Sequence, residues 1–313
     1  MPKALITGAT GQDGYYLTEL LDSKGYEVHA FVRRTSKPHE LHHATACVHH
    51  GSMEDYQSIL NAVVNAKADE IYHLAAQSFV HESFVDPGTT FNVNVAGTNK
   101  LLDAIRTLEK QPRMYFAATS EMYGNSDCEI QDENTSFNPV SPYGVSKLAG
   151  YHLARIYRKA YGLPIWCGIM FNHESPRRGI EFVTQKIVQN ALIAAQKPGH
   201  RFSLGCMDAE RDWGHAKDYV HAMHLMLQSD DPDDYVVATG KKTTVREFCR
   251  KVFNKLGLDY SDYISTDNAY SRPFELYSLC GNTNKIHSAL GWIPTHSIDD
   301  LVYDMLTADG LGK

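Results

Sequence analysis

The stretch Thr7-Gly8-Ala9-Thr10-Gly11-Gln12-Asp13-Gly14 decides how the N-terminal part of this chain folds. The apolar run Lys3–Thr7 before it predicts a short buried strand, and leucines at helical spacing predict a helix over Tyr15–Lys24. Gly25 predicts the end of that helix, and Glu27–Val32 predicts a second strand. A strand, a glycine turn and a helix in this order are typical of a dinucleotide-binding unit, in which a pyrophosphate rests on the helix N-terminus.

The residues after the second predicted strand indicate which dinucleotide binds. An acidic residue there would bind the ribose 2′-hydroxyl of NAD, but this chain has Arg33-Arg34-Thr35-Ser36. Two guanidinium groups suit a 2′-phosphate. We therefore predict NADP as the cofactor, the alternative being that Arg33 and Arg34 are solvated surface residues.

A second informative stretch is Pro142-Tyr143-Gly144-Val145-Ser146-Lys147. Pro142 predicts the start of a helix, on which Tyr143 and Lys147 share one face because they are four residues apart. Lys147 is expected to favour the Tyr143 phenolate and to lower the pKa of that phenol from its usual value of about 10. Tyr143 could then act as a base, although the same spacing also occurs on ordinary solvated helices.

Strand and helix patterns alternate through about residue 170. The expected strands are Glu70–Leu74, Arg113–Thr119 and Pro164–Met170, and a helix is expected to include Val95–Arg106. This alternation predicts an α/β fold with a doubly wound parallel sheet of the Rossmann type. Ligands of such sheets bind beyond the carboxyl ends of the strands.

After residue 172 the polar segments Asn172–Glu181 and Asp208–Asp218 interrupt the alternation, with helices expected over Glu181–Gln196 and Val245–Leu256. We predict a dinucleotide-binding domain over residues 1–171, to which later segments return. Residues 172–313 are predicted to form mainly a smaller substrate-binding region.

Composition excludes several classes of function. The chain has 313 residues, 43% of them hydrophobic, and a net charge of −7, which disfavours a nucleic-acid binder or an anionic-membrane binder. No apolar run approaches the roughly 20 residues of a membrane span. The chain enters a strand directly, and its six cysteines are scattered without a CxxC pair. We therefore expect a cytoplasmic protein with reduced thiols and no leader peptide.

Histidines are concentrated in one segment, at His39, His42, His43, His49 and His50. A metal site is conceivable there, but zinc sites usually show tighter spacing with cysteine or carboxylate support. We expect a surface loop and no metal.

Several blocks together resemble the GDP-mannose 4,6-dehydratase family within the extended short-chain dehydrogenase/reductases, over residues 3 to about 305. The blocks are the glycine turn, Leu74-Ala75-Ala76-Gln77-Ser78, Thr119-Ser120-Glu121-Met122-Tyr123-Gly124, Ser141-Pro142-Tyr143-Gly144 with Lys147, Phe171–Gly179 and Arg211–Val220. The resemblance implies conversion of GDP-mannose to GDP-4-keto-6-deoxymannose and water, the first step toward GDP-deoxyhexoses. It implies that Tyr143 accepts the C4 hydroxyl proton, that Glu121 is the base at C5, and that Thr119 and Lys147 support them.

The resemblance also implies the residues that bind the ligands. Those for NADP are Gly8, Gly11, Gln12, Asp13, Gly14, Arg33, Arg34, Ser52, Met53, Leu74, Ala75, Ala76, Ser78, Tyr143, Lys147, His173 and Arg178. Those for GDP-mannose are Ser78, Thr119, Ser120, Glu121, Tyr143, Asn172, Lys186, Arg211, Arg272 and Glu275. Arg211 and Arg272 would bind the diphosphate and Glu275 the guanine edge.

The chain departs from the family pattern in several places. Ser52 stands where an aspartate usually receives the adenine amino group, and Gln185 stands where an arginine precedes Lys186. The segment between Arg34 and Gly51 is short, as in the shorter bacterial branch. A homo-oligomer is implied, with a tetramer favoured and a dimer left open.

Two other functions stay open at this point. One is a reductase of the same superfamily, or a bifunctional enzyme that also reduces the keto product to GDP-rhamnose. The other is a regulatory protein that binds NADP without catalysis, against which the full set of Thr119, Glu121, Tyr143 and Lys147 argues.

Overall fold

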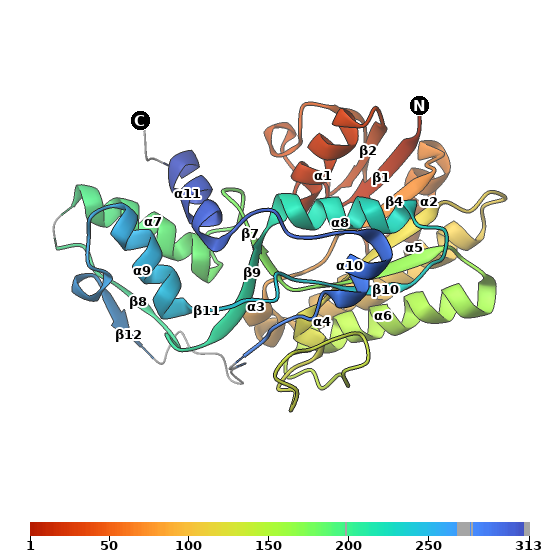
Figure 1. Cartoon of the computed structure of the whole chain (residues 1–313). Helices are drawn as coiled ribbons and strands as arrows, with labels where there is room; N and C mark the ends of the chain where they lie inside the picture. Colours follow the sequence, from red (N-terminus) through yellow and green to blue (C-terminus); the bar gives the residue numbers. More distant parts are fainter. Residues whose placement is uncertain (198, 268–275, 277, 310–313) are drawn as a thin grey trace.

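A seven-stranded parallel sheet is the centre of the computed structural model, which describes residues 1–197, 199–267, 276 and 278–309 (Figure 1). The strand order is β10-β6-β5-β4-β1-β2-β3, so the predicted doubly wound parallel sheet is confirmed. The strands are β1 (Lys3–Thr7), β2 (Glu27–Val32), β3 (Thr45–His50), β4 (Glu70–His73), β5 (Arg113–Thr119), β6 (Ile165–Met170) and β10 (Asp234–Val237). The order reverses between β1 and β4, which is where such sheets bind ligands.

Helices cover both faces of this sheet. One face carries α1 (Gln12–Ser23) and α8 (Ala216–Gln228), whereas α2 (Tyr56–Ala66), α5 (Gly97–Arg106) and α6 (Pro142–Tyr161) cover the other. The shorter elements between strands are η1 (Pro38–Glu40), α3 (Val80–Val85), α4 (Pro87–Phe91), the π-helical turn η2 (Asn92–Ala96) and η3 (Ser120–Met122). Two apolar cores result, one on each face.

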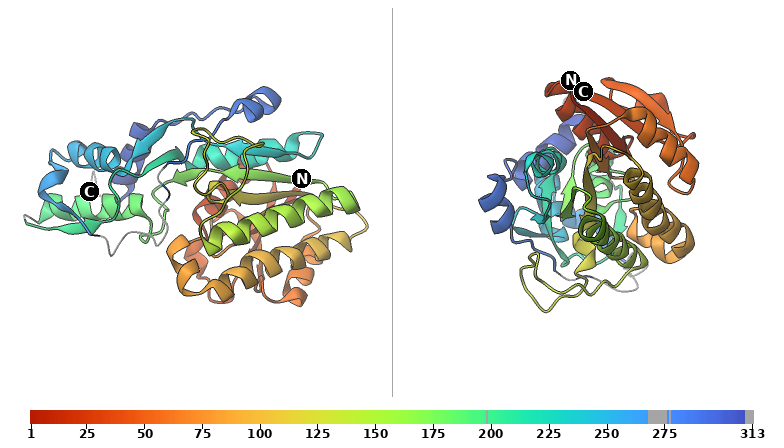
Figure 2. Two further views of the ribbon diagram at one scale, coloured as in Figure 1. Left: turned by 90° about the horizontal axis from the view of Figure 1, so that it is seen from below. Right: turned by 90° about the vertical axis from the view of Figure 1, so that its right-hand side faces the viewer.

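A smaller group of elements lies beside the sheet and not over either face, as Figure 1 and the left view of Figure 2 show. Three helices share a third apolar core: α7 (Val183–Gln196), α9 (Val245–Lys255) and α11 (Ile298–Asp309). The strands are β7 (Asn172–Glu174), β9 (Glu210–His215) and β11 (Lys242–Thr244) in one small sheet, and β8 (Phe202–Leu204) and β12 (Ile264–Thr266) in another. The short helix η4 (Tyr260–Asp262) precedes β12.

The C-terminal half contributes to both parts. Strand β10 pairs with β6 in the large sheet, α8 packs against α1, and α10 (Asn284–Leu290) packs against β10. We propose that the first domain comprises residues 1–171 together with these returning elements. In the part of the chain that the structure describes, no helix combines the length and apolar character needed to cross a bilayer.

The two polar segments after residue 172 hold strands that the sequence pattern did not predict, β7 and β9. Each strand also buries polar side chains, which are hydrogen-bonded. Asp212 of β9 is fully buried and accepts hydrogen bonds from the backbone N–H groups of Thr239 and Gly240, each 2.8 Å away. A satisfied buried carboxylate gives a strand a polar sequence, so hydrophobic periodicity does not reveal it.

Candidate active site

Two glycines of the β1–α1 turn leave no room for a side chain. Gly8 has φ +77°, and a Cβ there would lie 2.8 Å from the backbone nitrogen of Ala75. A Cβ on Gly14 would lie 2.5 Å from the Gly8 carbonyl oxygen. Helix α1 follows at once, and its N-cap Gly11 supplies no side-chain cap. The turn is therefore a backbone cradle at a helix N-terminus, which suits a phosphate group.

The opposite wall is tied to this turn by hydrogen bonds from β7. Asp13 Oδ2 lies 2.8 Å from His173 Nε2, and Gln12 Nε2 donates to the His173 carbonyl at 3.0 Å. Ser175 Oγ donates to Gln12 Oε1 at 2.7 Å. Burial favours the neutral form of each side chain, but the charge and the hydrogen bond of the partner together have the larger effect. His173 therefore lowers the pKa of Asp13, and Asp13 raises the pKa of His173. The turn is thus held rigidly against β7.

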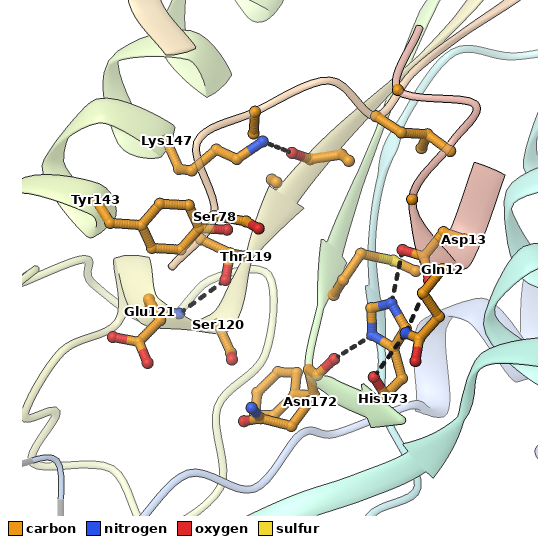
Figure 3. A pocket seen from close by; sticks show the side chains of 18 of the residues that line it. Gln12, Asp13, Ser78, Thr119, Ser120, Glu121, Tyr143, Lys147, Asn172 and His173 are labelled. Atoms are coloured by element: carbon orange, nitrogen blue, oxygen red, sulfur yellow. Dashed lines mark hydrogen bonds and ion pairs between the residues drawn. The ribbon is translucent and has the colours of Figure 1, made fainter. Parts of the chain in front are cut away.

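The candidate catalytic side chains gather between α6 and the end of β5 (Figure 3). Helix α6 begins at Pro142 as predicted, and the Ser141 side chain accepts a hydrogen bond from the Gly144 N–H at 3.0 Å. Thr119 Oγ1 accepts the Glu121 N–H at 3.3 Å, and the Thr119 side chain lies close enough to the Tyr143 phenol to lower its pKa. Thr119 therefore lies beside both the carboxylate-bearing loop and the phenol.

The predicted lowering of the Tyr143 pKa by Lys147 is wrong for this structure. Burial and, to a smaller extent, the nearby Glu121 carboxylate raise the pKa of Tyr143 to about 12, although the adjacent Thr119 side chain opposes this. Lys147 instead donates from Nζ to the Ala117 carbonyl at 2.9 Å. Sharing a helix face brings the two side chains into one pocket, but it does not by itself make Tyr143 a phenolate.

Lys147 is buried as a cation, at a cost to the fold. Its side chain lies among the β5 backbone and the Phe116 ring, whose centroid is 5.4 Å from Nζ. Burial lowers the pKa of Lys147 from 10.5 to about 8. Below pH 8 the folded state therefore carries a penalty of about 3 kcal/mol, since each pKa unit corresponds to about 1.4 kcal/mol.

We expect Lys147→Met to stabilise the fold while it abolishes activity. The variant loses one hydrogen bond, worth about 1 kcal/mol, but it no longer buries a cation. Its free energy of unfolding should therefore be about 2 kcal/mol higher than that of the wild type below pH 8. The folded-state pKa is depressed, so the wild-type penalty disappears as pH rises from 8 to 10.5 and the advantage of the variant should shrink there. Denaturant unfolding of both proteins at several pH values measures this. A less stable variant at pH 7 would contradict it.

Most of the predicted cofactor and catalytic residues line one pocket. Those in its lining are Gly8, Gly11, Gln12, Asp13, Gly14, Leu74, Ala76, Ser78, Thr119, Ser120, Glu121, Tyr143, Lys147, Asn172, His173 and Arg178. Other predicted cofactor residues are not in this lining, namely Arg33, Arg34, Ser52, Met53 and Ala75. The exposed Arg33 and Arg34 follow β2 and Ser52 follows β3, so they lie at the same carboxyl edge of the sheet. Met53 is buried against Gly97.

A second pocket adjoins the first and shares four lining residues with it, namely Val80, Asn172, Arg178 and Phe182. Lys186 and Arg211 line it, as predicted for substrate residues. Lys186 Nζ donates to the Ser203 carbonyl at 2.9 Å, and Arg211 Nη1 donates to the Leu276 carbonyl at 2.8 Å. The predicted substrate residues Arg272 and Glu275 lie outside the described residues.

Sequence reasoning missed side chains that position the site. Asn94, in the π-helical turn, donates to Ser146 Oγ and to the Gln77 carbonyl, each at 3.0 Å, and accepts the Gln77 N–H at 2.8 Å. It thereby joins the loop after β4 to α6 beside Lys147. Glu174 pairs with Arg178 Nε at 3.0 Å. A π turn within a helical pattern often marks a functional site, but hydrophobic spacing does not disclose it.

The expectation of a surface loop for the histidine-rich segment is wrong in part. His49 and His50 belong to β3, and His42 is 5% exposed and packs edge-on against Tyr15, with ring centroids 4.8 Å apart. Only His39 and His43 of this group lie exposed outside strands.

The doubly wound sheet, the glycine cradle and the buried Tyr143–Lys147 pair define a Rossmann-fold protein of the extended short-chain dehydrogenase/reductase class. Comparison with known proteins identifies the family within this class. The family described as GDP-mannose 4,6 dehydratase matches residues 5–305, and the chain belongs to that family. "GDP-mannose 4,6 dehydratase 2" of Arabidopsis thaliana is 44% identical over 98% of this chain and 86% of its own length. "GDP-mannose 4,6 dehydratase" of Homo sapiens is 42% identical over 98% of this chain and 91% of its own length.

Solved structures agree with the fold. DesIV, a dTDP-glucose 4,6-dehydratase from Streptomyces venezuelae with NAD and TYD bound, is 25% identical with a TM-score of 0.87, over 98% of this chain and 96% of its own. A UDP-glucose 4-epimerase from Thermus thermophilus in complex with NAD is 26% identical, with a TM-score of 0.86 over 98% of each chain.

Proposed function

We propose that this protein is a hydro-lyase that converts GDP-α-D-mannose to GDP-4-keto-6-deoxy-D-mannose and water. Family membership supports the reaction, and one observation in the structure carries it. Thr119 accepts the Glu121 backbone N–H and lies beside the Tyr143 phenol in one pocket, so that one sugar ring could meet both a phenol and a carboxylate. A reductase or epimerase needs a proton donor or acceptor at one carbon, whereas an elimination needs a second base.

The cofactor side of the pocket fits a nicotinamide dinucleotide. The glycine turn has no room for side chains at Gly8 and Gly14, and the N-terminus of α1 suits a pyrophosphate. Lys147, which lines the same pocket, is proposed to bind the nicotinamide ribose. A bound oxidised nicotinamide would supply a positive charge that favours the Tyr143 phenolate, together with the hydride acceptor for C4 and the hydride donor for C6 of the sugar.

The protein's own residues then account for the proton transfers. Tyr143 accepts the proton of the C4 hydroxyl as C4 becomes a ketone. That ketone acidifies the C5 hydrogen, which Glu121 removes, and the protonated Glu121 passes this proton to the departing C6 hydroxyl to form water. In the last step C5 takes up the proton that Tyr143 holds, so that Tyr143 and Glu121 both return to their starting states. Thr119 orients both groups.

The second pocket is the proposed site of the GDP moiety. Lys186 and Arg211 line it and bring two positive charges to the diphosphate. Asn172 stands where the two pockets meet, between the proposed sugar and cofactor sites. A homo-oligomer, either a tetramer or a dimer, and a cytoplasmic location remain predictions.

The first experiment is mass spectrometry of GDP-mannose incubated with the purified protein and catalytic NADP. We expect loss of one water from the sugar nucleotide without net accumulation of NADPH. Intact GDP-mannose, or consumption of added NADPH by the product, would instead favour another GDP-sugar as substrate or the reductase alternative.

We propose NADP over NAD because Arg33 and Arg34 are exposed at the end of β2. Arg33→Ala and Arg34→Ala should each raise KM for NADP by about 10–100-fold, the equivalent of one charged hydrogen bond. KM for NAD, measured in parallel as the matched control, should stay nearly constant. Equal KM changes for both cofactors would show that these arginines do not read the 2′-phosphate.

A further inference from the structure

Three potential metal ligands meet on one face of the outer strands β2 and β3. His29 is the partner of Cys47 in the strand register, and His49 lies two residues further along β3. Side chains two residues apart on a strand share a face, so all three point the same way. One ligand atom of each lies within 4.8 Å of the others. The sites proposed above for cofactor and sugar do not use these residues.

Hydrogen bonding already orients His29 as a metal-bound histidine would be oriented. Its Nε2 lies 2.8 Å from Glu27 Oε1, and its Nδ1 lies 2.9 Å from His49 Nε2. Because the carboxylate accepts the Nε2 proton, the Nδ1 lone pair faces His49 and Cys47. A carboxylate that holds the far nitrogen of a ligand histidine is the usual support of a protein metal site.

The burial of the cluster suits an ion that enters from solvent. His29 is 5% exposed, whereas Cys47 and His49 on the outermost strand are partly exposed. Two imidazoles and one thiolate are a ligand set that favours Zn²⁺ over Mg²⁺ or Ca²⁺, and tetrahedral geometry leaves a fourth position for water.

We propose that His29, Cys47 and His49 form a site for a divalent transition metal, with Zn²⁺ as the favoured ion and Glu27 as its supporting carboxylate. Binding releases the Cys47 thiol proton to solvent. His49 moves its proton from Nε2 to Nδ1, and the metal takes the place of the His29–His49 hydrogen bond. The ion clamps the edge strand β3 to β2, four residues before Arg33 and three before Ser52.

Cobalt is the probe for this site because tetrahedral Co²⁺ absorbs visible light and a thiolate ligand adds a near-ultraviolet charge-transfer band. Chelator-treated full-length protein should bind one Co²⁺ per chain with both features, and Zn²⁺ should displace it. Zn²⁺ should also raise the Tm and slow hydrogen exchange of the β3 amides. Failure to bind one ion per chain with a tetrahedral spectrum would overturn the proposal.

Variants test two of the ligands and the supporting carboxylate. Cys47→Ser should remove the charge-transfer band, and His49→Gln should weaken binding at least tenfold. Glu27→Gln, on the support of His29, should weaken binding about 10–100-fold. The matched controls change exposed residues of the same type, namely His50→Gln on the same strand and Cys128→Ser on a distant loop, and both should bind as the wild type does. A charge-transfer band that survives Cys47→Ser, or equal loss in His50→Gln, would contradict the site.

Discussion

Replacing Glu121 by Gln is expected to lower the rate of dehydration by about 10²–10⁴-fold while C4 oxidation continues, since this is the range of general acid–base contributions. The amide has the shape of the carboxyl group but cannot take the C5 proton. Glu121 is 7% exposed, and its backbone N–H is held by Thr119. The variant side chain should therefore keep its place.

Rapid quenching and mass spectrometry measure this result. The variant should accumulate a GDP-4-keto sugar that has kept its water, up to about one equivalent per active site, with a matching burst of reduced nicotinamide absorbance. Glu129→Gln makes the same chemical change on a carboxylate that is 81% exposed and should behave as the wild type. Rapid dehydration by the Glu121 variant would assign the C5 base to another group.

Tyr143→Phe should lower the overall rate by a similar factor of about 10²–10⁴, but without any burst. This variant removes only the phenolic oxygen that is proposed to accept the C4 proton. The ring stays buried on α6, and Thr119 still accepts the Glu121 N–H, so the fold and the proposed second base are preserved. C4 oxidation is then the step that fails.

The contrast between the two variants separates the two proton transfers. Tyr161→Phe is the control for Tyr143, because Tyr161 is 49% exposed at the other end of α6. If Tyr143→Phe gave the same burst of 4-keto sugar as Glu121→Gln, the C4 proton would have another acceptor, and the assignment of Tyr143 would be wrong.

Local patterns in the sequence predicted the first half of the fold well. The strands Lys3–Thr7, Glu27–Val32 and Arg113–Thr119 have the bounds that were expected, because apolar runs and glycine punctuation report directly on buried parallel strands. Pro142 likewise marked the start of α6. These features depend on a few neighbouring residues, which is why the sequence alone reveals them.

Features that depend on distant partners were not predictable in this way. Strand β9 is polar because residues more than 25 positions away satisfy Asp212. The pKa of Tyr143 depends on burial and on Glu121, neither of which the spacing to Lys147 reports. The cluster of His29, Cys47 and His49 exists only because β2 and β3 pair in one register. Each of these is a tertiary effect.

The most direct test of the proposed reaction follows a deuterium atom placed at C4 of GDP-mannose. The product should lose one water and keep the deuterium, now in the C6 methyl group, with only catalytic NADP present and its oxidation state unchanged at the end. Loss of the deuterium to solvent or its stoichiometric retention in reduced cofactor would contradict internal hydride return, and with it the assignment of this site to a dehydration.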